Sequence, residues 1–221
     1  MEKAKKFGAS LWVIVCYFAI STILTGIGIT LQFRNEIFNN IVLIFASTYA
    51  TGFVVYKFRE KLKGQWGNFK KNAQKYLRIA AKNWLFGLVL MMISNAILIA
   101  LLGDIAPNEE SIREIENQFF FYSIMYVCVL APVAEELLFR LNFKDVFEKE
   151  RIFLWVTSLL FGGMHVIVNV AAWTDVLYII PYAILGYYFG KTYIETKNIY
   201  ASISAHMAQN ILAMFLSTIG I

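Results

Sequence analysis

The sequence is organised around A-P-V-A-E-E-L-L-F-R (residues 131–140), which places two adjacent carboxylates, Glu135 and Glu136, at the end of an apolar run. None of the 18 residues directly before the pair, residues 117–134, is charged. An ionisable side chain inside an apolar span is energetically expensive and marks a functional site by default. We therefore predict that the rest of the chain serves to position this stretch.

The composition is that of a membrane protein. Of the 221 residues, 59% are hydrophobic and 16% are charged, against about 25% charged residues in soluble domains. Apolar runs long enough to cross a bilayer as helices recur along the chain, and none shows the alternation of a barrel strand. The two cysteines, Cys16 and Cys128, lie in such runs and do not indicate a disulfide framework. The sequence predicts an all-α, polytopic membrane protein that forms a single transmembrane domain over residues 1–221.

Seven transmembrane helices are predicted from these runs. They cover residues 8–33, 37–56, 83–102, 118–138, 152–172, 176–190 and 199–219. With the N-terminus inside, 18 of the 20 lysine and arginine residues fall in inner segments, and only Arg34 and Arg113 fall outside. The positive-inside rule therefore predicts a cytoplasmic N-terminus. The net charge of +5 follows from this topology, so the expected partner is the lipid bilayer and no nucleic acid is expected.

The longest inner segment, residues 57–82, is basic and also carries several aromatic side chains. One interpretation is an amphipathic helix that lies on the inner leaflet and is attracted to anionic lipid. The other is a solvated loop whose charges only fix the topology. Residues 1–117, which include this segment, hold no catalytic motif, whereas residues 118–221 hold every candidate site residue.

Helical spacing predicts different surroundings for the two carboxylates. Residues four apart share a face of a helix, so Glu136 and Arg140 are predicted to form an ion pair. Glu135 points elsewhere and has no partner nearby in the sequence, which leaves it free for chemistry. Pro132, one turn upstream, is expected to kink the helix and open room for water.

The only two histidines, His165 and His206, lie in later apolar runs. Each is followed four residues later by an amide, Asn169 and Asn210, which is expected on the same helical face. The glycines at positions 162 and 163, directly before the first histidine, are expected to let another helix approach closely. A lone membrane histidine usually serves helix packing, but two of them beside amides and a buried carboxylate pair favour a site.

These groups suit the hydrolysis of an amide bond. A glutamate can deprotonate water, and histidine with asparagine can stabilise the oxyanion. The same groups, Glu135, His165 and His206, could instead hold a divalent metal such as zinc that activates the water. The residues alone leave both interpretations open.

Three motifs occur in order on successive late spans. They are E-E-x-x-x-R (Glu135, Glu136, Arg140), F-x-x-x-H (Phe161, His165) and H-x-x-x-N (His206, Asn210). This set resembles the CPBP family of intramembrane proteases, also called the CAAX protease or Abi family, which includes the CAAX prenyl endopeptidases. The resemblance covers roughly residues 118–219.

The resemblance implies a role for each matching residue. Glu135 is the general base, and His165 shares the water with it. His206 and Asn210 lie on the oxyanion side, while Glu136 and Arg140 support the site together with Phe161. Members of this family are called metalloproteases, although a metal-free glutamate mechanism has also been argued for them.

The function expected from this resemblance is that of an intramembrane endopeptidase acting on a membrane-associated peptide or protein. The Glu135–Glu136 pair lies near the inner end of its predicted helix, so substrate is expected from the cytoplasmic side. A composition rich in Ile, Lys and Asn indicates the plasma membrane of a bacterium. The substrate, its prenylation and the oligomeric state are not indicated by the sequence.

Other classes of membrane protein fit the sequence less well. Elbows of the G-x-S-x-G type and the H-E-x-x-H motif are absent from the sequence, and Asp104, Asp145 and Asp175 all fall in predicted loops. A non-catalytic membrane protein, such as a bacteriocin self-immunity factor or a scaffold, stays open as the alternative. A transporter is less favoured, because no repeat symmetry is visible.

Overall fold

The computed structural model describes residues 2–30, 35–103, 105–167, 169–170 and 172–219. All regular elements within these ranges are helices. In chain order they are α1 (Glu2–Thr30), α2 (Glu36–Leu102), α3 (Pro107–Gln118), α4 (Phe120–Met125), η1 (Tyr126–Leu130), α5 (Ala131–Glu136), η2 (Leu137–Leu141), α6 (Glu150–Ile167), η3 (Trp173–Tyr178), α7 (Ile179–Thr196) and α8 (Ile199–Thr218). The predicted all-α membrane fold is confirmed.

Four of the described helices, α1, α2, α6 and α8, are long and apolar enough to cross a membrane. The 67-residue α2 contains two of the predicted spans, residues 37–56 and 83–102, which we call its first and second arms. Large apolar side chains point outward from both arms, among them Phe45 (72% exposed) and Leu101 (74% exposed). An apolar outer surface of this kind is typical of a face that contacts lipid.

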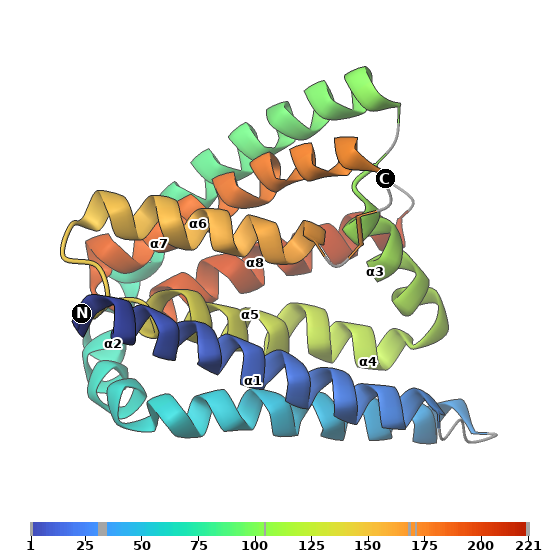
Figure 1. Ribbon diagram of the computed structural model, residues 1–221, viewed down its shortest axis with the longest axis horizontal. Coiled ribbons are helices and arrows are strands. Elements are labelled where there is room, and N and C mark those ends of the chain that lie inside the picture. Colours follow the sequence, from blue (N-terminus) through green and yellow to red (C-terminus); the bar gives the residue numbers. More distant parts are fainter. Residues whose placement is uncertain (1, 31–34, 104, 168, 171, 220–221) are drawn as a thin grey trace.

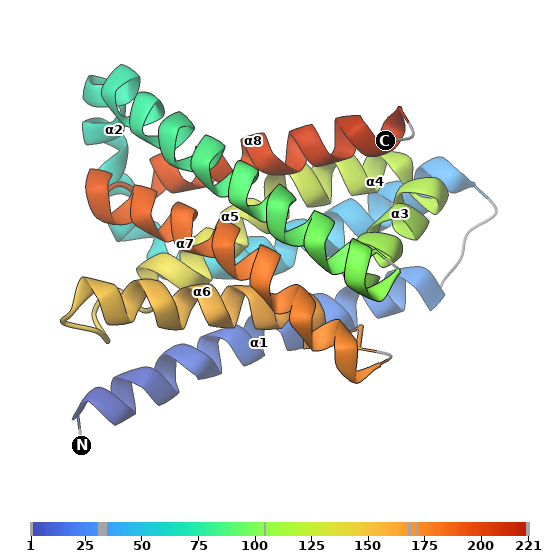
Figure 2. The ribbon, with the colours of Figure 1, turned by 90° about the horizontal axis from the view of Figure 1, so that it is seen from above.

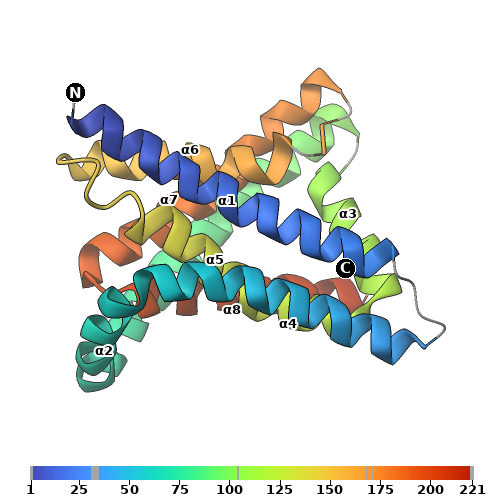
Figure 3. The same cartoon turned by 60° about the horizontal axis from the view of Figure 1, so that its bottom comes forward.

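The two ends of the helix bundle differ in what they carry. The N-terminus, the middle of α2 and the connection between η2 and α6 lie at one end, which we call the inner end (Figures 1 and 3). Helix α3, the connection between α6 and α7 and the C-terminal end of α8 lie at the other, which we call the outer end. The basic segments gather at the inner end, for which the positive-inside rule predicts the cytoplasmic side.

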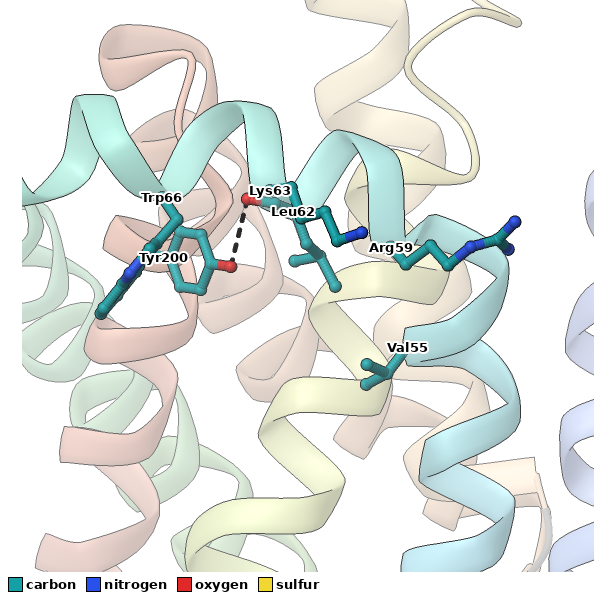
Figure 4. A pocket seen from close by; sticks show the side chains of 6 residues that line it. All are labelled: Val55, Arg59, Leu62, Lys63, Trp66 and Tyr200. Atoms are coloured by element: carbon teal, nitrogen blue, oxygen red, sulfur yellow. Dashed lines mark hydrogen bonds between the residues drawn. The ribbon is translucent and has the colours of Figure 1, made fainter.

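The basic segment, residues 57–82, is helical and joins the two arms of α2 as a crosspiece. Figure 4 shows the chain turning between Val55 and Leu62, and Asn72 interrupts the helix with φ −118° and ψ 17°. Of the two interpretations of this segment, the loop is therefore excluded. The second arm then runs back beside α7 and α8 (Figure 2).

The crosspiece also fixes the start of α8. The side-chain oxygen of Gln65 accepts a hydrogen bond from the backbone N–H of Ile199 (2.6 Å), and its backbone oxygen accepts one from the Asn198 side chain (2.9 Å). Asn198 in turn caps the helix by accepting from the N–H of Tyr200 (3.1 Å). Because the first N–H groups of a helix have no partner within it, these bonds stabilise the end of α8 from which His206 is positioned.

Helices α6 and α7 pack closely at Gly162. A Cβ atom at this position would lie 2.6 Å from the carbonyl oxygen of Ile179 and 2.9 Å from the backbone nitrogen of Ala183. Only glycine permits this approach. At Gly163 a Cβ would meet only Ile167 of its own helix, at 3.5 Å. The expected close approach is therefore made by the first glycine alone.

The fifth predicted span is too long. Helix α6 ends at Ile167, whereas the apolar run predicted a helix to residue 172. The N–H of Asn169 bonds to the carbonyl of Val166 (3.0 Å) in a tight turn, and Ala172 is extended at the start of η3. The chain must reverse here for α7 to pack against α6, and apolar composition alone does not show such a reversal.

Candidate active site

The two glutamates lie on α5, a single α-helical stretch between two π-helical ones. The N–H of Ala131 bonds to the carbonyl of Tyr126, and the N–H of Asn142 bonds to the carbonyl of Leu137 (3.0 Å), each five residues back. Such π-turns are rare and occur frequently at functional sites. Each π-turn rotates the residues beyond it relative to a regular α-helix, and one such turn lies on either side of the carboxylate pair.

Pro132 explains how Asn210 is held. Proline has no N–H, so the π-register that pairs Ala131 with Tyr126 leaves the next carbonyl, that of Val127, without a backbone donor. The side-chain Nδ2 of Asn210 donates to this carbonyl at 2.8 Å. Asn210 therefore ties α8 to η1, and one of its two N–H groups is left for another acceptor.

Glu136 lies at the centre of a fully buried polar network. Arg140 donates to it from Nε (3.0 Å) and Nη2 (3.4 Å), as the i, i+4 spacing predicted. Ser202 donates a short hydrogen bond to its Oε2, and Nδ1 of His206 lies 3.2 Å from its Oε1. Both side chains of the ion pair are 0% exposed. A buried charge needs this degree of pairing, because its loss of hydration is otherwise uncompensated.

Arg140 extends the network to α6 and α7. Its Nη2 donates to the carbonyl of Gly186 (2.9 Å) and its Nη1 to the hydroxyl of Thr157 (3.2 Å). The guanidinium also lies over the ring of Phe161, 5.7 Å from its centroid. One side chain thus joins η2, α6 and α7, and through Glu136 it reaches α8.

Glu135 is held differently from its neighbour. Its Oε2 is a buried atom with no hydrogen-bond partner among the described residues. The nearest basic groups are the Nε2 atoms of His165 (3.6 Å) and His206 (3.8 Å). These separations are too long for direct hydrogen bonds. The carboxylate therefore faces two imidazoles without being bound to either.

Both imidazole rings are fixed by their other nitrogen and by aromatic neighbours. Nδ1 of His165 donates to the carbonyl of Phe161 (2.8 Å), and its ring stacks on Tyr182 with centroids 4.8 Å apart. Nδ1 of His206 faces Glu136, and its ring stacks on Phe189 at 4.6 Å. Since carbonyls and carboxylates only accept, Nδ1 carries the proton in each ring and Nε2 is turned toward Glu135.

Most of the residues expected at the site come together. The structure places Glu135, Glu136, Arg140, Phe161, His165, His206 and Asn210 around one point where α5, α6 and α8 meet. Asn169 lies beyond the end of α6 at Ile167, so its place at the site stays a prediction. The helix ends before it, so four-residue spacing no longer implies a shared face.

Several supporting residues were missed by the sequence reasoning. Ser202 lies four residues before His206 on α8, so the i, i+4 rule that found Arg140 could have found it. Thr157, Tyr182 and Phe189 reach the site from α6 and α7 through tertiary packing. No spacing in the sequence indicates them.

A cavity of about 440 Å³ reaches the site, a size typical of ligand pockets. His165, His206 and Asn210 line it, together with Phe161 and Phe189. The groups that face Glu135 are therefore accessible to a molecule in this cavity.

Residues 117–212 match the family described as Type II CAAX prenyl endopeptidase Rce1-like. The match confirms the predicted resemblance to the CAAX protease family over this segment, which is less than half of the chain. All seven assembled site residues fall within the matched segment, whereas the crosspiece and both arms of α2 lie outside it. Comparisons with curated proteins and with solved structures found no match. The CAAX protease family implies proteolytic activity in the membrane.

The network around Glu136 predicts a strong effect of losing one charge. Substitution Arg140→Met leaves a buried carboxylate without its main partner and should cost about 3–5 kcal/mol of folding stability. The double variant Glu136→Leu with Arg140→Met removes both charges and should recover part of this loss. Thermal unfolding in detergent measures both. A double variant that is no more stable than Arg140→Met would contradict the assignment of a structural ion pair.

Proposed function

We propose that this protein is an intramembrane endopeptidase in which Glu135 activates the attacking water. The observation that carries the proposal is the Oε2 atom of Glu135, which is buried, has no hydrogen-bond partner among the described residues and faces Nε2 of both histidines. A carboxylate needs such freedom to take a proton from water, since a committed oxygen would first have to break a bond.

The bond-making steps follow from the positions of these groups. Glu135 takes one proton from water while Nε2 of His165 holds the water by accepting its second hydrogen, and the water oxygen attacks the carbonyl carbon of the substrate. The resulting oxyanion accepts hydrogen bonds from the free N–H of Asn210 and from Nε2 of His206. The C–N bond then breaks as Glu135 returns its proton to the leaving amine. The products are a carboxylic acid and an amine.

His206 can donate to the oxyanion only when both of its ring nitrogens carry protons. Its Nδ1 proton is directed at Glu136 Oε1 (3.2 Å), so Nε2 must supply a second one. The ring lies between two carboxylates, Glu135 and Glu136, which compensate the positive charge of the protonated form. We propose that this is the role of the second glutamate in the reaction.

A metal-dependent reaction was the other interpretation of the same residues. Two imidazoles and one carboxylate are a donor set that catalytic zinc uses. Among the residues that the structure describes, however, no group of three or more His, Cys, Asp or Glu side chains has metal-binding spacing. We propose the glutamate mechanism, in which the side chains themselves activate the water, and the metal-dependent reaction is the alternative that chelation tests.

Glu135→Gln tests the proposal directly. Glutamine has the same shape but cannot accept the proton of water, so cleavage of a membrane-anchored peptide reporter should fall by about 10²–10⁴-fold. The matched control is Glu148→Gln, which changes an exposed carboxylate at the inner end and should leave cleavage unchanged. Full cleavage by the Glu135 variant would contradict the proposal and favour a non-catalytic function.

Chelation separates the two mechanisms. Purified protein treated with 1,10-phenanthroline and EDTA should keep its full rate of reporter cleavage, because no step depends on a metal. Mass spectrometry of the purified protein supplies an independent check of bound zinc. Loss of cleavage that is restored by added zinc would overturn the glutamate mechanism.

A further inference from the structure

The crosspiece of α2 has an apolar and a charged side. Phe58 belongs to the apolar core of the bundle, and Leu62 packs against that core. The nine lysine and arginine residues of the crosspiece are all exposed, and Glu60 is its single acidic residue. The crosspiece lies at the inner end of the bundle (Figure 1), which is the level expected for lipid headgroups.

A hollow of about 440 Å³ lies where the crosspiece meets α8. None of the described residues lines both this hollow and the cavity at the candidate active site. Figure 4 shows Val55 and Leu62 pointing into the inside of the turn, with Trp66 and Tyr200 next to each other beside them. The rings of Trp66 and Tyr200 are 5.0 Å apart between centroids. The inside of the hollow is therefore apolar.

Two cationic residues, Arg59 and Lys63, complete the lining of the hollow, four residues apart on the exposed side of the helix. Nη1 of Arg59 donates to the carbonyl of Tyr56 (2.9 Å), and its Nε lies 3.4 Å from Glu60. The same carboxylate lies 3.8 Å from Nζ of Lys63. One carboxylate between two cations leaves a net positive charge, and it occupies only part of the donors that arginine and lysine carry.

This lining selects a ligand that is apolar at one end and anionic at the other. Inside the hollow the hydroxyl of Tyr200 is already used, because it donates to the carbonyl of Leu62 (3.2 Å). A small phosphate compound would meet the two cations but leave the apolar part empty. A phospholipid with an anionic headgroup matches both parts, and basic pockets at the cytoplasmic ends of membrane helices bind such headgroups.

We propose that this hollow is a binding site for an anionic phospholipid of the inner leaflet. One acyl chain lies against Val55 and Leu62, and the lipid phosphate contacts Arg59 and Lys63. The general attraction to anionic lipid that the sequence indicates for the crosspiece thereby becomes a site with defined residues. The inference does not depend on the proposed function, because lipid binding is measured without a substrate.

The bound lipid also contacts the start of the helix that carries His206. Tyr200 lies in the first turn of α8 and lines the hollow. A ligand that binds only the folded protein stabilises it in proportion to its occupancy. Added anionic lipid should therefore raise the thermal unfolding temperature of the protein in detergent.

Native mass spectrometry of the full chain in detergent tests the site. Phosphatidylglycerol and phosphatidylcholine with the same acyl chains are added separately over a concentration series. Phosphatidylglycerol should bind at least about tenfold more tightly, because each cation near the membrane surface contributes about fivefold to the attraction of an anionic lipid. Equal affinity for the two lipids would overturn the proposal.

Charge variants separate a defined site from diffuse attraction. Arg59→Gln with Lys63→Gln should lower the affinity for phosphatidylglycerol by about tenfold or more. The matched control, Lys75→Gln with Arg78→Gln, removes the same charges from exposed positions beyond the interruption at Asn72. The control should bind phosphatidylglycerol less than about threefold more weakly than the unmodified protein. Equal losses in the two double variants would overturn the site.

A filled hollow tests the place of the acyl chain. Val55→Trp occupies the apolar part while both cations stay, so it should lower the affinity as far as the Arg59→Gln and Lys63→Gln variant does. Val89→Trp makes the same exchange at an outward position of the second arm (54% exposed) and should bind lipid normally. Full affinity in Val55→Trp would overturn the proposed placement. If Val55→Trp does not fold, the charge variants decide.

Two further outcomes would assign the hollow to another occupant. Soluble glycerophosphoglycerol, which has the headgroup without acyl chains, should not compete with the lipid, and competition by it would indicate a site for small phosphate compounds. A dimer in lipid-free detergent that is lost in Val55→Trp would indicate a second copy of the chain. Either result would overturn the proposal.

Discussion

The buried ion pair between Glu136 and Arg140 is the interaction on which the site depends. Through Arg140 it fixes the carbonyl of Gly186 and the hydroxyl of Thr157, and through Glu136 it orients Ser202 and His206. Four separate helical segments are therefore held in register by two opposite charges. An ion pair that is fully removed from water requires such complete hydrogen bonding to be retained.

The ion pair also explains why Glu136 and the adjacent Glu135 have different roles. Both carboxylate oxygens of Glu136 accept hydrogen bonds, whereas Oε2 of the adjacent Glu135 has no partner in the part of the chain that the structure describes. Two identical side chains, one residue apart, thus have different surroundings because a helix turns them about 100° from each other. We propose that the reaction uses this difference, with one glutamate positioning the imidazole and the other moving the proton. Unsatisfied buried groups of this kind are usual at functional sites.

Much of this arrangement could be predicted from sequence, because it depends on periodicity within one helix. The Glu136–Arg140 pair is of this kind, whereas the meeting of the histidine helices with the carboxylates was expected from the resemblance to a known family. The bond from Asn210 to Val127 could not be predicted, since it depends on a π-turn that has no sequence signature. The end of α6 before Asn169 could not be predicted, because a tertiary reversal of the chain ends the helix inside an apolar run.

The central claim is that Glu136 supports the structure whereas Glu135 is free to react. The thermal unfolding of Glu135→Gln and Glu136→Gln, compared in the same detergent, tests it most directly. The account predicts that Glu136→Gln is destabilised by about 3–5 kcal/mol, while Glu135→Gln is as stable as the unmodified protein or more so. Equal losses in the two variants, or a larger loss for Glu135→Gln, would contradict it.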